Sequence, residues 1–268
     1  MTTSYIKLKR IKMNLELSGK NAIITGATRG IGLAIATSLA EEGANIAICS
    51  RNAEDAQRVA KELAAKHGIK AISGSVDLYD QESYLSWLKN SAEQLGGIDI
   101  FVSNVTAGTA LGADAWGAWE EYFNVDLMAA VRGFETVLPF LQASKAASAI
   151  FISSTAALEH FAPSPPGFMA LKAALVTQAK TLAKHHGKDG IRINSISPGP
   201  VYVDGGAWEY VKNEMTELYE QTLKDIPLGR MANADEIGKF TAFLASPAAS
   251  FMNGGNYVLD GGLTSKIA

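Results

Sequence analysis

The chain has 268 residues, of which 47% are hydrophobic and 19% are charged, and its formal net charge is −3. These values are ordinary for a soluble globular protein and give no global basic field that would attract nucleic acid. No apolar run reaches the ~18 residues of a membrane span. The single cysteine, Cys49, excludes an internal disulfide. It is consistent with a reducing compartment, so we expect a cytoplasmic protein.

The first 13 residues differ in character from the rest. Four cations, Lys7, Lys9, Arg10 and Lys12, lie in a stretch without helical or strand periodicity, and no apolar signal-peptide core follows them. We expect residues 1–13 to be a disordered extension and residues 14–268 to form one domain. The alternative for the extension is a basic arm that binds a membrane surface or nucleic acid.

From residue 14 onward, short β-branched runs alternate with longer helical patterns. The predicted strands cover residues 22–25, 45–49, 70–76, 98–103, 149–154, 191–196 and 256–259. The first predicted helix follows a Gly-rich turn and ends near Gly43, and the others cover residues 53–67, 81–95, 116–143, 167–186, 209–224 and 234–245. Strands separated by such helices imply parallel pairing with right-handed crossovers. We therefore predict a doubly wound, Rossmann-like α/β fold, with about seven strands and helices on both faces of the sheet.

The turn between the first strand and the first helix has the pattern of a phosphate-binding loop. Residues 25–32 read TGATRGIG, with glycines spaced GxxxGxG. Glycine is required where a turn is tight and where the backbone must approach a pyrophosphate, and the start of the helix offers free N–H groups. The alternative is a glycine turn without a ligand. We expect a dinucleotide to contact Gly26, Thr28, Arg29, Gly30, Ile31 and Gly32.

The end of the second strand indicates which dinucleotide binds. An acidic residue there would bind a ribose 2′-hydroxyl and repel a 2′-phosphate. This chain has Ser50 and Arg51 instead, and an arginine can bind a phosphate through two N–H groups. With Arg29 as a second cation, the sequence favours NADP(H), unless the two arginines are solvated surface residues.

The ordered motifs of the chain resemble those of the short-chain dehydrogenase/reductase superfamily. After the Gly-rich loop, the matching segments are VDL at 76–78, SNVT at 103–106, NV at 124–125, ISS at 152–154, FMALK at 168–172, SPG at 197–199 and DGG at 260–262. SNVT departs from the family's usual Asn-Asn-Ala-Gly. The resemblance implies further cofactor contacts at Asp77, Leu78, Asn104, Val105, Lys172, Pro198, Gly199 and Val201.

The resemblance also assigns the catalytic positions. In the family a tyrosine exchanges a proton with the substrate oxygen, and a lysine lowers the tyrosine's pKa and binds the nicotinamide ribose. A serine binds the substrate oxygen, and a helix asparagine holds a water behind the lysine. By position these residues are Phe168, Lys172, Ser154 and Asn124. Thr155 is the alternative to Ser154, because the segment between residues 154 and 168 is one residue longer than usual.

Phenylalanine at position 168 has no proton to give. The resemblance therefore implies an NADP(H)-dependent oxidoreductase that interconverts a carbonyl and a secondary alcohol, impaired in this copy. The alternative is a nucleotide-binding pseudoenzyme with a sensing or scaffolding role. Replacement of Phe168 by tyrosine is expected to raise turnover by about 10²–10⁴-fold. If another acid serves the site, His160 and Tyr202 are the candidates.

Residues 201–226 stand where the family has a mobile substrate lid. The aromatic and apolar side chains there suit an apolar or aromatic substrate, although they are equally suited to packing the lid onto the domain. They are Tyr202, Trp208, Tyr210, Met215 and Tyr219. The resemblance further implies a homo-oligomer, a tetramer above all, that pairs through the helices holding Asn124 and Phe168. We find no cluster of metal-ligating residues and expect no metal site.

Overall fold

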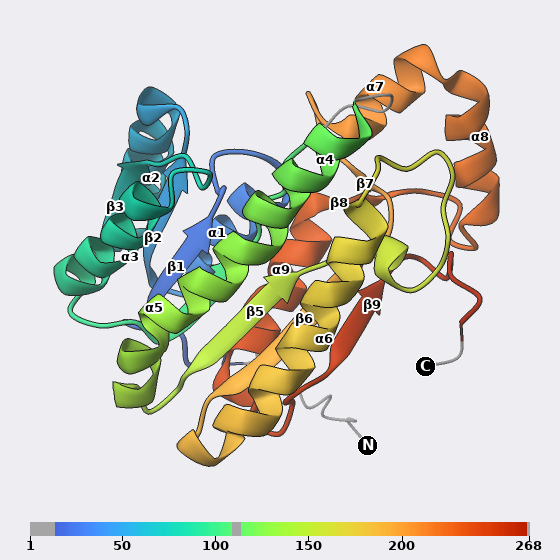
Figure 1. Cartoon of the computed structure of the whole chain (residues 1–268). Helices are drawn as coiled ribbons and strands as arrows, with labels where there is room; N and C mark the ends of the chain where they lie inside the picture. The colour runs from blue at the N-terminus through green and yellow to red at the C-terminus, as the bar shows by residue number, and fades with distance from the viewer. Residues whose placement is uncertain (1–13, 109–113, 267–268) are drawn as a thin grey trace, which may run out of the picture.

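The computed structural model describes residues 14–108 and 114–266 (Figure 1). The expectation of a disordered extension at residues 1–13, with its four cations, lies outside the described residues.

Seven parallel strands form the central sheet, as predicted. In sheet order they are β3 (Ala71–Ser75), β2 (Asn45–Ser50), β1 (Asn21–Thr25), β4 (Ile100–Ser103), β5 (Ser148–Ile152), β6 (Arg192–Pro198) and β9 (Asn256–Leu259). Every neighbouring pair is parallel. Chain order runs outward in both directions from β1 and β4, so the switch point of a doubly wound sheet lies between these two strands.

Helices cover both faces of this sheet (Figure 1). One face is covered by α1 (Gly30–Glu41), α2 (Ala53–His67) and α9 (Ala234–Ala245), and the other by α3 (Gln81–Leu95), α5 (Ala129–Ala143) and α6 (Phe168–His186). Strand residues alternate between the two cores: Ala22 and Ile24 belong to the first, and Ile23 belongs to the second. The fold class predicted from the sequence is confirmed.

Three predicted elements differ from those observed. The predicted strand at 149–154 ends at Ile152, so Ser154 lies beyond it and caps the short 3₁₀ helix η2 (Thr155–Ala157). The long helix predicted at 116–143 consists of α4 (Ala115–Tyr122), the π-helical turn η1 (Phe123–Met128) and α5. The helix predicted at 209–224 is interrupted at Met215 into α7 (Ala207–Glu214) and α8 (Thr216–Asp225).

A small second sheet, absent from the sequence prediction, joins the lid region to the domain. Its strands β7 (Val201–Tyr202) and β8 (Ala232–Asn233) pair in parallel, with Val201 opposite Ala232. The segment that contains α7 and α8 therefore leaves and re-enters the domain at neighbouring points.

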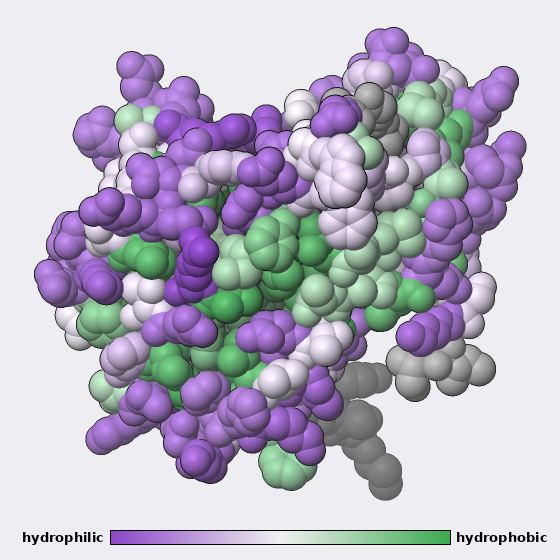
Figure 2. Space-filling view, in the orientation of Figure 1, coloured by the Kyte–Doolittle hydropathy of each residue, from purple (hydrophilic) through white to green (hydrophobic). Residues whose placement is uncertain are grey.

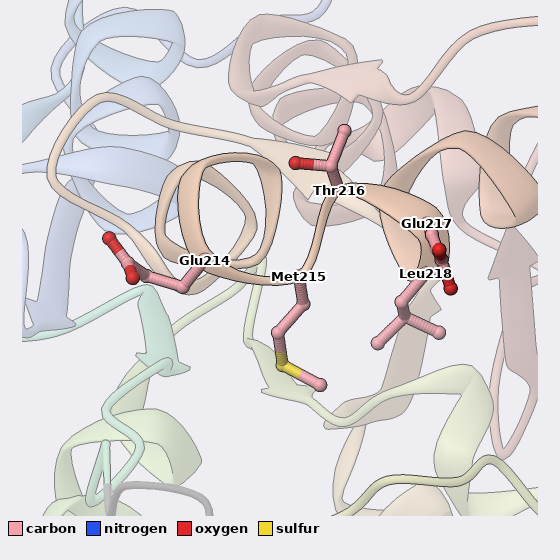
Figure 3. Close-up of a pocket in the computed structure, with 5 residues that line it drawn as sticks. All are labelled: Glu214, Met215, Thr216, Glu217 and Leu218. Carbon is pink, nitrogen blue, oxygen red and sulfur yellow. The ribbon is translucent and has the colours of Figure 1, made fainter.

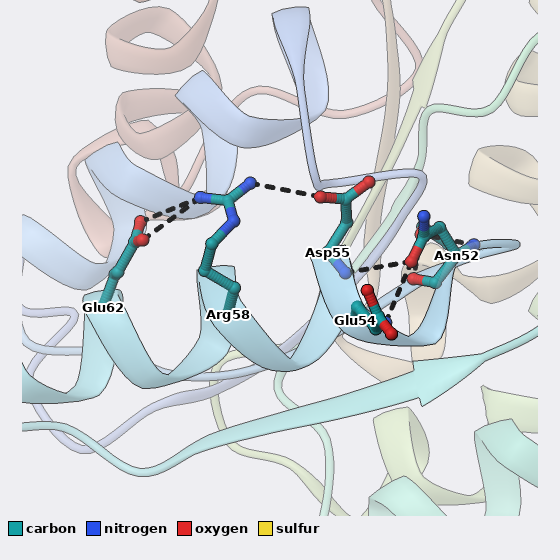
Figure 4. Close-up of polar contacts among 6 residues, drawn as sticks. Asn52, Glu54, Asp55, Arg58 and Glu62 are labelled. Atoms are coloured by element: carbon teal, nitrogen blue, oxygen red, sulfur yellow. Dashed lines mark hydrogen bonds and ion pairs between the residues drawn. The ribbon is translucent and has the colours of Figure 1, made fainter.

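Side-chain caps fix where α2 begins, immediately after the second strand. The Asn52 side-chain oxygen accepts hydrogen bonds from the backbone N–H groups of Glu54 and Asp55 (Figure 4). Arg58 then bridges Asp55 and Glu62 along the same helix. Because the helix cannot start earlier, Ser50 and Arg51 remain in the loop at the carboxyl end of the sheet.

The single cysteine belongs to the core of the second face. Cys49 is fully buried, and desolvation raises the pKa of its thiol to about 12. It is therefore a packing residue and not a nucleophile. Among the described helices, none has the length and apolar character needed to cross a membrane.

Candidate functional site

The Gly-rich loop lies at the switch point of the sheet and needs its glycines for steric reasons. Gly26 has a φ of +65°, and a Cβ on it would lie 2.6 Å from Cγ2 of Val105. A Cβ on Gly32 would collide with the carbonyl oxygen of Gly26. The loop can therefore turn this tightly only if both positions lack a side chain.

The first turn of α1 presents its backbone amides without a side-chain cap. Arg29 is the N-cap residue, in an extended conformation, and its side chain makes no hydrogen bond to the turn. Free amides and the positive end of the helix dipole make such a terminus a suitable site for an anion. Thr28 and Ile31, both half-buried, flank Gly30 on the same turn. The residues predicted to contact a dinucleotide are therefore contiguous in the loop and the first turn of α1, with Gly32 buried.

Asn104, which follows β4, braces this loop from the neighbouring strand. Its side-chain amide donates to the carbonyl oxygens of Thr25 and Gly26, both at 3.1 Å. Its backbone N–H donates to Oγ1 of Thr25 at 3.0 Å. The side-chain amide and backbone N–H of Asn104 thus hold the loop, and Val105 lies against Gly26.

The residues predicted at the adenosine end lie at the carboxyl ends of β2 and β3. Oγ of Ser50 donates to the carbonyl oxygen of Asn52 at 2.8 Å, while Arg51 is exposed. Leu78 is buried, and the exposed Asp77 carboxylate accepts from the N–H of Tyr79 at 3.0 Å. Ser50 and Arg51 thus lie at the same edge of the sheet as the Gly-rich loop.

Arg29 borders a separate hollow of about 530 Å³ between α1 and the segment that follows β7. Two carboxylates, Asp204 and Asp235, line the same hollow.

Lys172 is buried at the carboxyl end of β5 and forms an ion pair that the sequence did not predict. Its Nζ lies 2.9 Å from Oδ2 of Asp126, and both side chains are almost fully buried. Nζ also donates to the carbonyl oxygen of Ile152 at 3.3 Å. A buried ammonium needs such a counter-charge, because the desolvation of an unpaired charge is very costly.

Asp126 is in turn held by the segment that follows β4. Oγ1 of Thr106 donates to Oδ2 of Asp126 at 2.8 Å, and the backbone N–H of Ala107 donates to Oδ1 at 2.8 Å. Both carboxylate oxygens are therefore hydrogen-bonded, and the carboxylate links β4, η1 and α6.

The structure places Asp126, and not Asn124, beside Lys172. The Asn124 side-chain amide donates to the carbonyl oxygen of Glu120, one turn back on its own helix, at 2.9 Å. The π-helical turn explains the difference, because its wider turn changes which residues face inward relative to a uniform α-helix. One signal was available in the sequence: Asp126 is an acidic residue between Val125 and Leu127, in an apolar run.

Phe168 is the first residue of α6, and its ring packs against that of Tyr122. Its ring centroid is 5.4 Å from that of Tyr122, at an interplanar angle of 60°. Nζ of Lys172 lies 5.8 Å from the centroid of the Phe168 ring. The side chain predicted at the proton-donor position is thus close to the lysine, as the i, i+4 spacing required.

Three hydroxyl side chains follow β5, and they differ in burial and in hydrogen bonding. Ser153 is buried and its Oγ donates to the carbonyl oxygen of Lys172 at 2.9 Å, which ties α6 to β5. Ser154 is half-buried, and its Oγ accepts from the N–H of Ala156 at 3.1 Å. Thr155, the alternative assignment, is buried. Ser154 is therefore the more accessible hydroxyl at this edge.

The residues predicted near the nicotinamide follow β6. Gly199 lies so close to Asp260 that a Cβ on it would be 2.7 Å from the Asp260 Cβ. Its N–H donates to the carbonyl oxygen of Leu259 at 2.9 Å. Pro198 and Val201 are buried on either side, which fixes the path of the chain into the small second sheet.

The lid region has a bend at Met215, between α7 and α8, with a pocket of about 380 Å³ there. Figure 3 shows Met215 and Leu218 extending to one side of this junction and Thr216 to the other.

Tyr202, one of the two candidate acids, packs beneath the Lys212 ammonium, whose Nζ is 5.4 Å from the ring centroid. His160, the other candidate acid, is exposed. Over residues 14–108 and 114–266, no cluster of three or more potential metal ligands is present.

Removal of Lys172 tests the ion pair. We expect Lys172→Met to lower the free energy of unfolding by about 3–5 kcal/mol, because it leaves the Asp126 carboxylate buried without its cation. The double variant Lys172→Met with Asp126→Leu should recover most of this loss. Urea denaturation measures both, with Lys184→Met on the exposed side of α6 as the control. Equal losses in the single and double variants would contradict the assignment.

Comparisons with known proteins identify the family of the chain. Residues 26–264 match the protein family described as enoyl-(acyl carrier protein) reductase. The chain is 34% identical over 250 residues to an isoepoxydon dehydrogenase of Aspergillus clavatus, covering 92% of this chain and 96% of that protein. It is 31% identical over 249 residues to a 3-oxoacyl-[acyl-carrier-protein] reductase of Chlamydia trachomatis, covering 92% and 98%.

Among solved structures, L-sorbose reductase from Gluconobacter frateurii, complexed with NADPH and L-sorbose, superimposes with a TM-score of 0.86 at 31% identity. The superposition covers 95% of this chain and 100% of the reductase chain. The matched regions include both the Gly-rich loop and the segment that holds Lys172. The chain belongs to the short-chain dehydrogenase/reductase superfamily of oxidoreductases.

Proposed function

We propose that the chain is an NADP(H)-dependent oxidoreductase that interconverts a carbonyl and a secondary alcohol, with its proton-transfer step impaired by Phe168. The observation that carries the proposal is one connected set of contacts at the carboxyl edge of the sheet. Asn104 braces the Gly-rich loop, and two residues further on Thr106 binds Asp126, which pairs with Lys172. Both halves of a dinucleotide site are thus held in one unit.

The residues of the loop suit a dinucleotide phosphate. The uncapped amides at the start of α1 would bind the pyrophosphate, and Arg51 would bind a 2′-phosphate on the adenosine ribose. The L-sorbose reductase, which was solved with NADPH, and a short-chain dehydrogenase from Burkholderia cenocepacia, solved with NADP, support this preference.

At the other end, Lys172 would bind the nicotinamide ribose. An ammonium has three N–H donors. Among the described contacts, Asp126 and Ile152 accept from two of them, which leaves one for a ribose hydroxyl. Val201 and Gly199 would border the nicotinamide, since they follow β6 at the same edge.

The chemistry divides between the ligand and the protein. A bound nicotinamide would supply or accept the hydride. Ser154 would hydrogen-bond the substrate oxygen, which also has to gain or lose a proton. Phe168 stands at the family's position for that proton transfer and has no acidic group. We propose that water takes over the transfer, at a cost of about 3–5 kcal/mol in activation free energy.

The aromatic lid favours an apolar or ring-containing substrate. Trp208, Tyr210 and Tyr219 lie on α7 and α8, which follow β7 after a four-residue connection. Such a segment can cover a ligand that lies beside Val201 while keeping its own backbone hydrogen bonds. The substrate side of the proposal is therefore a small carbonyl compound or alcohol with an apolar body.

We expect NADPH to bind more tightly than NADH. Arg51→Ala should weaken NADPH binding by about 10–100-fold, because a charge-assisted bond to the 2′-phosphate is lost, and should leave NADH binding nearly unchanged. Fluorescence titration of both cofactors measures this. Arg58→Ala, which removes an arginine already paired with Asp55 and Glu62, is the control. Equal affinities of the parent for the two cofactors would refute the preference.

The impaired proton step predicts a gain of function. Phe168→Tyr should raise the rate of NADPH oxidation across a panel of carbonyl compounds, with about 10²–10⁴-fold as the size of a fully restored acid–base contribution. NADPH affinity should barely change, because the loop and Lys172 are untouched. A variant that binds NADPH normally yet turns over no faster than the parent would favour a nucleotide-binding pseudoenzyme.

We also propose that the chain forms a homo-oligomer. Figure 2 shows apolar side chains gathered over α5 and α6, in the middle of the viewed face. Three of the α5 side chains, Val131, Leu138 and Phe140, are only half-buried in a single subunit. Two copies that paired through these helices would remove this apolar surface from water.

Light scattering at micromolar concentration should therefore give a mass that is a multiple of 28.4 kDa, with a tetramer as the expected state. Val131→Asp should lower the mass while keeping the circular dichroism of the parent, because a carboxylate would then have to be buried at the interface. A monomeric parent would count against the proposal.

A further inference from the structure

The site contains a negative charge that the proposed reaction does not require. Lys172 is the only cation among the described residues that contacts the Phe168 ring. Its ammonium, however, is not an unbalanced charge, because Asp126 lies 2.9 Å from it and both side chains are nearly buried. The carboxylate therefore offsets part of the field that the ammonium exerts on a group at position 168.

The pairing is built into the fold. Asp126 accepts hydrogen bonds from Thr106 and from the N–H of Ala107, so its two oxygens are fixed by groups outside its own helix. The π-helical turn brings the Asp126 side chain to the same side as Lys172. Neither partner can leave the pair without exposing a buried charge to an apolar environment.

We propose, on the basis of the oxidoreductase function above, that Asp126 is a positioning residue that neutralises Lys172, so that the lysine serves as a ligand-binding donor and not as an activator of an acid at position 168. Lys172 can still donate a hydrogen bond to a ribose hydroxyl when the Asp126 carboxylate neutralises its charge. An ammonium that had to favour a phenolate at position 168 would lose that ability. A carboxylate at position 126 is therefore compatible with a residue at position 168 that has no acidic group to stabilise.

The effect of Asp126 can be tested by changing single charges, because the elements around position 168 carry few charged or titratable groups. Lys172 lies on α6 itself, Asp126 on η1, and Tyr122 on α4 together with Glu120 and Glu121. Within the described part of the chain, η2 carries none, since it reads Thr-Ala-Ala. Of these groups, Asp126 is the one whose carboxylate contacts the lysine.

The experiment uses a tyrosine introduced at position 168 as a probe of the local charge. The near-ultraviolet absorbance of tyrosinate is followed against pH in the Phe168→Tyr variant without cofactor, and the titration of the parent, which has eight tyrosines, is subtracted. We expect the introduced phenol to titrate at or above the ordinary value of about 10, because Asp126 cancels the lysine. Adding Asp126→Asn should lower this pKa by about one unit or more.

Three further variants make the result specific. Glu135→Gln, which removes an exposed carboxylate from α5, should leave the pKa of the introduced phenol unchanged. Because Tyr122 is the ring neighbour of position 168, Tyr122→Phe is combined with Phe168→Tyr. A titration that persists in this double variant comes from the introduced phenol and not from Tyr122. Asp126→Ser removes the same charge with a different shape and replaces Asp126→Asn if that variant fails to fold.

The outcomes separate this proposal from the function on which it rests. A phenol that already titrates well below about 10 in Phe168→Tyr alone would overturn it, because the charge of Lys172 would then act unopposed. So would an unchanged pKa after the charge of Asp126 is removed. In turnover assays, adding Asp126→Asn to Phe168→Tyr should raise the rate further. If neither Phe168→Tyr nor its Asp126→Asn double variant turns over, but both titrate as expected, the proposed activity is wrong. The neutralisation of Lys172 by Asp126 would still be supported.

Discussion

A lysine ammonium buried at the carboxyl edge of the sheet has to meet a negative charge, and the arrangement of the site depends on how it does so. Asp126 supplies that charge, and Thr106 and Ala107 hold the carboxylate from the neighbouring strand end. Because the desolvation of two charges is offset only when their hydrogen bonds are satisfied, β4, η1 and α6 are fixed relative to one another. The loop that carries the dinucleotide motif is joined to the same unit through Asn104.

The parallel sheet explains why residues so distant in sequence meet. All seven strands run in one direction, so the loops after β1, β4, β5 and β6 lie at the same edge. Strict steric requirements at Gly26 and Gly32 shape the Gly-rich loop, whereas a buried ion pair shapes the surroundings of Lys172. The proposed function needs both, because a hydride transfer requires that the cofactor be held at its two ends.

The fold was predictable because its signals are local and repeated: apolar strands, capped helices such as α2, and a glycine loop in the first βαβ unit. The conformation of the glycine loop, with its side-chain-free positions Gly26 and Gly32, follows from the same local signals. The contact between Asp126 and Lys172 was not predictable, because it depends on a π-helical turn that sequence periodicity does not reveal. The sequence favoured Asn124, two residues away, for the place beside the lysine. The end of β5 before Ser154 and the break at Met215 likewise depend on tertiary packing and not on local propensity.

A crystal structure of the protein grown with NADPH would show where the cofactor lies and which groups hold it. We expect the dinucleotide to lie across residues 26–32, with Arg51 against the 2′-phosphate. Nζ of Lys172 should then contact the nicotinamide ribose while it remains paired with Asp126. A cofactor bound elsewhere, or a Lys172 that leaves Asp126 to reach Phe168 or the substrate, would contradict it.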